Sequence, residues 1–207
     1  MIKDYIFIDI YMIFTFIITY FICSINPAII ICKKKIGEDI RKLGSGNAGS
    51  ANVMRVLGKP MGVLIIILEF IKVFLSYYLV TLMCKIFSQE LSSGIISTFI
   101  LSVVIGQCFP IYYGFRGGKG ATVSIAVAFI FNYKYAIVCV IVSFIVYIIT
   151  RIPSVSSLSG VILYLILTIV MSFSYTIPVA IVTAIVLFQH RNNIKRIFQK
   201  QEKIFKM

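Results

Sequence analysis

Two short polar stretches, rich in glycine and cations, interrupt an otherwise apolar sequence. The first, RKLGSGNAGSANVMRVLGK, covers residues 41–59, and the second, GFRGGKG, covers residues 114–120. Glycines permit φ > 0 and leave successive N–H groups uncovered, so they can form an anion-binding concavity where a helix begins beside them. We expect such a helix over residues 50–57, with Arg55 on its second turn. The pattern suggests binding of a phosphate ester, and a solvated loop with a glycine cap is the equally simple alternative.

Two cations have the chemistry to hold phosphate groups. The guanidinium of Arg55 can bind a phosphate through two parallel hydrogen bonds, whereas Lys119 supplies a compact charge or is simply one more cytoplasmic cation. The GGKG run at residues 117–120 is not a nucleotide-binding loop of the GxxxxGK[ST] type. No glycine stands five positions before Gly118, and no Ser or Thr follows the lysine. We therefore do not expect ATP use.

The sequence contains a single histidine, His190, where the last apolar segment ends. With Asn193 close behind, it could act as a general base or donate to a phosphate, although an isolated interfacial histidine is more often inert. No carboxylate lies close to His190 in the sequence to orient its ring, and Lys195 stands five positions after it. We expect His190 and Asn193 to position substrate. Ser45 could act as a nucleophile, but no base lies near it in the sequence, so hydrogen bonding to substrate is its preferred role.

Further residues of the polar stretches are candidates for the same site. The backbone of Gly44, Gly46 and Asn47 is expected to contribute, and Ser154 and Ser157 are weaker candidates for lining it. The five cysteines are scattered, with no C-x-x-C pair, and are interpreted as small apolar fillers rather than disulfides or metal ligands. No metal and no cofactor is expected.

The composition is that of an integral membrane protein. The 207 residues are 60% apolar, with a mean hydropathy of +1.02. Because the polar regions are too short for a soluble domain, we expect a single all-α, polytopic membrane bundle over residues 1–207. The net charge of +13 is first a topology signal and can attract anionic lipids, so nucleic acid is not an expected partner. The first apolar run lacks a small-residue cleavage site and is interpreted as a retained span.

We expect about seven transmembrane helices. Three cover residues 5–32, 61–84 and 91–112, two short ones meet at residues 132–134 within 121–150, and two meet near 172–176 within 158–189. Pro27 is expected to kink the first span. The serines at 154–157 are expected in a polar loop, and the tail over residues 190–207 is expected to be helical.

Basic residues gather on one side of this arrangement. Of the 20 Lys and Arg residues, seven follow the first span, two the third, one the fifth and six the seventh. The opposite side holds only Lys3, Lys85 and Lys134. This excess predicts an outside N-terminus and a cytoplasmic C-terminus, with every glycine-rich or serine-rich loop on the cytoplasmic face. Five spans with re-entrant segments fit nearly as well.

Two charges fall within the second span. Glu69 and Lys72 are three residues apart on one helix, so they share a face and can pair. Intramembrane charges usually face inward and serve a function, but a mutual pair makes a structural role equally reasonable.

Three stretches in order, RKLGSGNAGSANVMRVLGK, GQCFPIYYGFRGGKGAT and HRNNIKRIFQKQEK, resemble the cytoplasmic motifs of the bacterial PlsY family. The resemblance covers nearly the whole chain. It implies seven spans with the N-terminus outside, and an acyl-phosphate:glycerol-3-phosphate acyltransferase of the bacterial cell membrane with its active site facing the cytoplasm. The implied reaction moves an acyl group from acyl phosphate to the sn-1 hydroxyl of glycerol 3-phosphate. It gives lysophosphatidic acid and phosphate, the first step of phospholipid synthesis, and the enzyme that makes acyl phosphate is a further candidate partner.

The resemblance also implies roles for particular residues. It makes Ser45, Arg55, His190 and Asn193 essential, and it gives Glu202 a structural role. The implied phosphate-binding loop consists of Gly117, Gly118, Lys119 and Gly120.

The sequence departs from the family at several positions. They are Gln107 (usually His), Ser50-Ala51 (usually Ala-Thr), Ala121 (usually Val) and Lys200 (usually Gly). These departures leave open the alternative of a divergent, non-catalytic paralogue that binds phosphorylated lipid precursors. A small anion transporter is less favoured, because transporters place polar residues near the bilayer midplane and here nearly all of them lie at one face.

Overall fold

The computed structural model describes residues 2–202 and 204, and within these residues the chain is helical and contains no strand. The elements are α1 (Ile2–Ser24), α2 (Pro27–Ile36), η1 (Ile40–Lys42), α3 (Ser50–Leu57), α4 (Lys59–Ile86), α5 (Ser93–Cys108), η2 (Ile111–Tyr113), α6 (Ala121–Thr150), α7 (Pro153–Val170), α8 (Thr176–Gln189) and α9 (Arg191–Phe198). The expected all-α class is confirmed, and the expected helix over residues 50–57 is α3.

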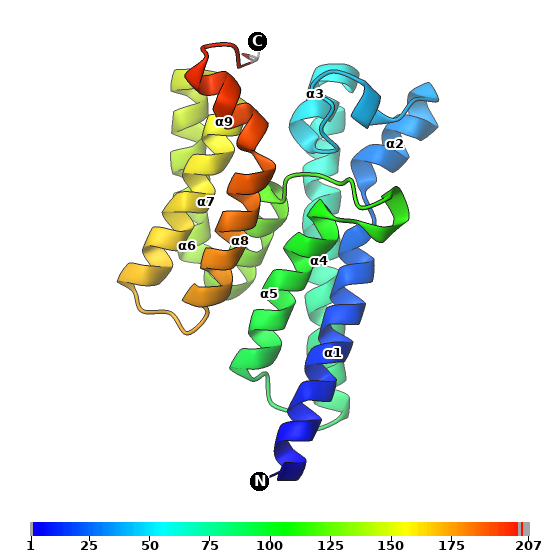
Figure 1. Ribbon diagram of the computed structural model, residues 1–207, viewed down its shortest axis with the longest axis vertical. Helices are drawn as coiled ribbons and strands as arrows, with labels where there is room; N and C mark the ends of the chain where they lie inside the picture. Colours follow the sequence, from blue (N-terminus) through cyan, green and yellow to red (C-terminus); the bar gives the residue numbers. More distant parts are fainter. Residues whose placement is uncertain (1, 203, 205–207) are drawn as a thin grey trace.

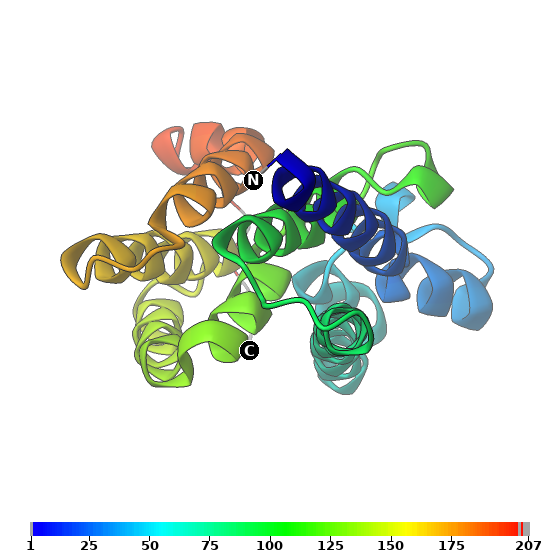
Figure 2. The ribbon, with the colours of Figure 1, turned by 90° about the horizontal axis from the view of Figure 1, so that it is seen from below.

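The helices form two groups that meet along α5. Figures 1 and 2 show α1 to α4 on one side of the bundle and α7 to α9 on the other. α5 packs against both α1 and α8, and α4 packs against α6. The buried apolar core where these helices meet includes Val73, Phe99 and Val127. The start of α1 and the short helix α9 lie at opposite ends of the bundle (Figure 1).

Long apolar helices with outward-facing aliphatic side chains make this a membrane protein. Five segments are long and apolar enough to cross a bilayer: Ile10–Ile36, Lys59–Ile86, Ser93–Tyr113, Ala121–Thr150 and Pro153–Val170. α8 is apolar but has only 14 residues. Side chains such as Ile71, Ile141 and Ile166 are about half exposed, as is usual for a surface that faces lipid.

The chain reverses direction within α6. Asn132 has φ −156° and ψ 83°, which no α-helix contains. A straight helix of this length would extend roughly 45 Å. Nevertheless Lys119 before α6 and Ser154 after it belong to one hydrogen-bonded group, joined through Asn193 and Glu202. The structure therefore agrees with two shorter helices meeting near residues 132–134. Counting the two halves and α8 gives seven apolar passes, but seven crossings and the orientation of the termini stay predictions.

The first expected span is not one helix. α1 ends at Ser24 and α2 begins at Pro27, so the kink expected at the proline is a full break. Pro27 stands in the first turn of α2, where a missing N–H costs nothing. The side chain of Asn26 accepts from the N–H of Ile29 at 3.1 Å and caps the new helix.

Two other expectations need correction. The serines at 154–157 are not in a loop, because α7 begins at Pro153 and they form its first turns. The tail is helical only over Arg191–Phe198, and residues 203 and 205–207 of the expected tail helix lie outside the described part of the chain. The third span, Ser93–Tyr113, agrees with the expected residues 91–112, although it consists of α5 and a separate 3-10 turn over residues 111–113.

Candidate active site

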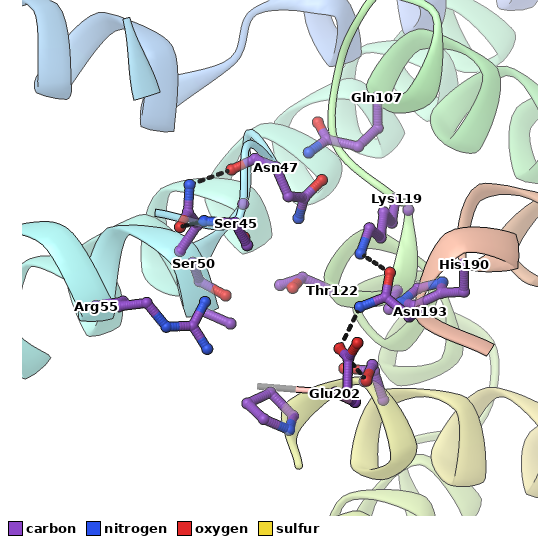
Figure 3. A pocket seen from close by; sticks show the side chains of 18 of the residues that line it. Ser45, Asn47, Ser50, Arg55, Gln107, Lys119, Thr122, His190, Asn193 and Glu202 are labelled. Atoms are coloured by element: carbon purple, nitrogen blue, oxygen red, sulfur yellow. Dashed lines mark hydrogen bonds between the residues drawn. The ribbon is translucent and has the colours of Figure 1, made fainter. Parts of the chain in front are cut away.

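A cavity of about 180 Å³ opens between α3 on one side and α6, α7 and α9 on the other (Figure 3). Ten of the expected site residues line it: Ser45, Asn47, Arg55, Lys119, Gly120, Ser154, Ser157, His190, Asn193 and Glu202. Residues from four separate parts of the sequence, 45–55, 119–122, 153–157 and 190–202, thus converge on one cavity.

Four helices begin at this cavity. Residues of the first turns of α3, α6, α7 and α9 line it, among them Ser50, Thr122, Ser154 and Asn193. The first N–H groups of a helix lack partners within the helix, and the helix dipole places positive charge there. The N-caps of α3 and α6 are glycines that make no side-chain capping bond. The convergence suits anionic groups such as phosphates.

The glycine-rich loop is folded around Asn52, which is 1% exposed. Its Oδ1 accepts from the N–H of Ser45 at 2.7 Å, and its Nδ2 lies within 3.1 Å of the carbonyl oxygens of residues 40, 43 and 47. Gly44 has φ 59°, and a Cβ there would lie 2.3 Å from Asn52 Oδ1. Gly44 and Gly46 are outside the cavity lining, so they shape the loop rather than line the site. Asn52 was not among the residues expected at the site. The one signal for it in the sequence was its position three residues before Arg55.

The second glycine loop does not offer the amides that were expected. The N–H of Gly117 donates to the carbonyl of Cys108 at 3.1 Å, and that of Gly118 donates to the carbonyl of Gln107 at 3.0 Å. Neither glycine lines the cavity. A Cβ on Gly117 would lie 2.1 Å from the oxygen of Gln107. These glycines allow the loop to pack on the end of α5, and their N–H groups are not the phosphate donors that were expected.

Lys119 is the group that this loop delivers to the cavity. Its ammonium donates to Asn193 Oδ1, and Asn193 Nδ2 donates to Glu202. Burial lowers the pKa of Lys119 to about 8, against the opposing attraction of Glu202. The lysine is therefore mainly charged at pH 7, next to an amide rather than an opposite charge.

Glu202 belongs to the same hydrogen-bonded group as Lys119 and Asn193. It accepts from Ser154 at 2.9 Å and from Arg196 Nε at 2.6 Å. Burial favours a higher pKa for this carboxyl, but the hydrogen bonds from Arg196, Asn193 and Ser154 lower it overall. The charged glutamate ties α9 to the start of α7.

His190 is held in one tautomer. It is 3% exposed, and its Nδ1 lies 2.8 Å from the carbonyl oxygen of Val186. Burial, together with the charge of Lys119, lowers the pKa of the imidazole to about 4. The ring is neutral at pH 7, and because a carbonyl can only accept, Nδ1 carries the proton. Nε2 therefore presents a lone pair.

Cations stand on both walls of the cavity. Figure 3 shows Arg55 and Ser50 on the α3 side and Lys119, His190 and Asn193 on the other. Two anionic groups could therefore be bound at once, one against each wall.

Two residues from deeper in the bundle also reach the cavity. They are Glu69 of α4 and Gln107 of α5. Lys72 Nζ lies 2.7 Å from Glu69 Oε2, which confirms the ion pair expected from their spacing.

Known proteins show the same sequence pattern over most of this chain. Residues 13–200 match the family described as "Glycerol-3-phosphate acyltransferase". A glycerol-3-phosphate acyltransferase of Aquifex aeolicus is 30% identical over 194 residues, which are 93% of this chain and 98% of that protein. One of Mycoplasma capricolum is 39% identical over 142 residues, or 69% of this chain, and the match spans only 55% of that longer protein.

Solved structures share the fold. The crystal structure of PlsY, an integral membrane glycerol 3-phosphate acyltransferase, in its glycerol 3-phosphate form has a TM-score of 0.84 and 29% sequence identity. The alignment covers 94% of this chain and 96% of that one. The lysophosphatidic acid form has a TM-score of 0.80 with 28% identity, over 94% and 95% of the two chains. Because the family match runs from the first span to the end of α9 and the fold is shared over the same length, this chain belongs to the glycerol-3-phosphate acyltransferase family.

Proposed function

We propose that the protein transfers an acyl group from acyl phosphate to the sn-1 hydroxyl of glycerol 3-phosphate. The observation that carries this proposal is a cavity with a cation on each wall and four helix N-termini around it. The reaction brings two phosphate-bearing substrates together, and each needs positive charge and backbone donors. The relatives and solved structures carry names that specify glycerol 3-phosphate as acceptor, which supports this half of the proposal.

The chemical step needs positioning and charge stabilisation more than a strong base. The hydroxyl oxygen attacks the acyl carbonyl carbon, the bond from that carbon to the phosphate oxygen breaks, and phosphate leaves with the electron pair. A base with a pKa near 4, as at His190, is weak at neutral pH. We assign to His190 Nε2 the task of accepting a hydrogen bond from the attacking hydroxyl. The departing phosphate then takes the proton, so that the products are lysophosphatidic acid and inorganic phosphate.

The acyl donor can be tested directly. Purified protein is supplied with glycerol 3-phosphate and palmitoyl phosphate, and both phosphate release and lysophosphatidic acid are measured. We expect equal amounts of the two products without coenzyme A, acyl carrier protein or added divalent metal. Turnover with acyl-coenzyme A and none with acyl phosphate would contradict the proposal.

Arg55 provides a second test, at the α3 wall. We assign to its guanidinium the stabilisation of charge on the departing phosphate, so Arg55→Ala should lower kcat by about a hundredfold. Arg55→Lys should restore little, because an ammonium cannot reproduce a planar two-pronged contact. The exposed Lys34 on α2 is a matched control outside the cavity, and Lys34→Ala should behave as the parent. If Arg55→Lys works as well as the parent, this role for Arg55 is wrong.

A non-catalytic paralogue that binds phosphorylated lipid precursors is the second candidate, motivated by Gln107. It predicts saturable binding of glycerol 3-phosphate without release of phosphate, so the same assay decides between the two. In either case we place the cavity at the cytoplasmic face of the bacterial cell membrane, on the basis of the basic residues that surround it. The enzyme that produces acyl phosphate would then reach the cavity from the cytoplasm.

A further inference from the structure

Beneath the cavity lies a buried polar cluster made of Glu69, Lys72 and Gln107. The three residues are 2%, 7% and 5% exposed. Besides its ion pair with Glu69, the Lys72 ammonium donates to Gln107 Oε1, and Gln107 Nε2 donates to Glu69 Oε1 at 3.0 Å. A neutral side-chain amide can accept from a cation and donate to a carboxylate at the same time. The cluster is therefore a closed triangle with the amide at one corner.

Lys72 connects this cluster to the break between α1 and α2. Its ammonium donates to the carbonyl of Cys23 at 3.1 Å and to that of Ile25 at 2.9 Å. In a continuous helix the first carbonyl would accept from residue 27, but Pro27 has no N–H. The second would accept from Ile29, whose N–H is taken by Asn26 Oδ1. Lys72 thus satisfies two of the carbonyls that lose their helical donors at the break.

Asn26, at the break between α1 and α2, is hydrogen-bonded to the first glycine-rich loop. Its Nδ2 donates to the carbonyl of Ala48 at 3.2 Å, and both residues are fully buried. Ala48 follows Asn47 and precedes Gly49, and both of those line the cavity. The backbone of this wall is therefore fixed to the helix break, and the helix break is fixed to Lys72.

Gln107 connects the cluster to the second loop. The main-chain carbonyl oxygen of Gln107 accepts a hydrogen bond from the N–H of Gly118, the residue before Lys119. A Cβ at Gly118 would lie 2.8 Å from Gln107 Nε2, so the loop packs directly on the side-chain amide. The amide that completes the triangle therefore lies against the backbone of the residue that precedes Lys119.

We propose that Gln107 is a positioning residue for Lys119, and that the Glu69–Lys72–Gln107 triangle fixes the two loops of the cavity relative to each other. The kinetic part of this proposal rests on the acyl transfer proposed above. Gln107 acts through Lys119 and through the loop backbone, and it takes no part in the chemical step.

The decisive variants change the amide and leave the ion pair in place. Gln107→Leu removes both hydrogen bonds, and Gln107→Asn keeps an amide that is too short to reach both partners. Gln107→His should rescue, because one ring nitrogen can accept from Lys72 while the other donates to Glu69. Ser102→Ala is the matched control, since Ser102 is buried on the same helix and its hydroxyl donates to the carbonyl of Thr98, one turn back on that helix.

Kinetics should separate positioning from chemistry. We expect Gln107→Leu and Gln107→Asn to raise KM for the phosphate-bearing substrate at Lys119 by roughly tenfold, with kcat changed less. Gln107→His and Ser102→Ala should stay close to the parent. If Gln107→Leu yields no folded protein in detergent, Gln107→Asn carries the test alone. A parent-like KM in a folded Gln107→Asn variant would overturn the proposal.

A second measurement does not depend on turnover. The Lys119 amine is labelled with trace acetic anhydride, quantified by peptide mass spectrometry against the exposed Lys34, with and without inorganic phosphate. We expect labelling of Lys119 to rise about fivefold in Gln107→Leu or Gln107→Asn, as its loop loosens. Labelling unchanged from the parent would overturn the proposal even if acyl transfer is confirmed. Changed labelling in a protein that shows no acyl transfer would support the positioning and refute only the proposed reaction.

Discussion

Among the residues of the site, Lys119 is the one whose charge should respond to pH near neutrality. Burial lowers its pKa to about 8, so the ammonium is charged below that pH and neutral above it. Between pH 7 and 9 we expect KM for the phosphate-bearing substrate to rise about tenfold, as the charged fraction falls. Lys119→Arg should remove this rise, because a guanidinium stays charged throughout. The same rise in Lys119→Arg would assign it to another group.

His190 can be observed directly, because it is the only histidine in the sequence. With a pKa of about 4, its ring should stay neutral down to pH 5.5. Protein labelled with ¹³C-histidine, prepared in micelles without a histidine tag, should show ring resonances that do not move between pH 5.5 and 7.5. A titration with a midpoint near 6.5, the ordinary value, would show that the ring is hydrated and not held as described here.

In the loop over residues 114–120, two glycines allow the cost of a steric clash to be compared with the cost of an unfavourable backbone conformation. A Cβ on Gly117 would lie 2.1 Å from the oxygen of Gln107 and 2.6 Å from Cδ of Pro110, so Gly117→Ala must displace the loop. We expect a loss of roughly 2 kcal/mol in the free energy of unfolding, as in overpacked cores, together with a raised KM.

Gly114 is the control in the same loop. Its φ is 63°, but a Cβ there meets no atom within 4 Å. Gly114→Ala should cost only the conformational term of about 1 kcal/mol, with KM unchanged. Chemical unfolding and kinetics in detergent measure both variants. Equal damage at the two positions would mean that the close packing of Gly117 on α5 is unimportant.

Structural features that depend on local composition could be predicted from the sequence. Features that depend on contacts between distant residues could not. Glycine and serine after Lys42 predicted the loop and α3, because capping is local. Residues 154–157 have the composition of a loop, but Pro153 begins a helix there and packing extends it. The break before Pro27 was underestimated, because two of the carbonyls that it frees are satisfied by Lys72, almost fifty residues away in the chain.

The site was predicted by residue type and only partly by role. Arg55, Lys119, His190 and Asn193 were named from the sequence, and the structure brings them to one cavity. The roles of the glycines could not be foreseen, because whether an N–H faces a ligand or a neighbouring carbonyl depends on how α5 ends. The role of Asn52 as the centre of its loop also arises only in the folded chain, from four contacts to backbone groups.

For the whole molecule, cysteine labelling tests which end of the bundle faces the cytoplasm and how often the chain crosses the membrane. All five cysteines, at positions 23, 32, 84, 108 and 139, are buried, so single exposed cysteines can be labelled against a low background. Positions 48 and 118 would be poor labelling sites because both are buried, whereas Glu38 and Gln199 are exposed at the end that carries the cavity. Glu90 and Ser174 are exposed in the turns at the other end.

We expect Glu38→Cys and Gln199→Cys to react with a membrane-impermeant maleimide only in inverted vesicles, and Glu90→Cys and Ser174→Cys only in intact cells with a permeabilised outer layer. The reason is the excess of basic residues around the cavity, which is retained on the cytoplasmic side.

Tyr133→Cys decides the number of crossings, since Tyr133 is exposed beside the reversal at Asn132. Tyr135 packs against Phe173, which places this turn next to the one that contains Ser174. If the chain crosses seven times, Tyr133→Cys reacts together with Ser174→Cys. Protection of Tyr133→Cys from both sides, with Ser174→Cys still reactive from outside, would mean that α6 enters the bilayer and returns without crossing it.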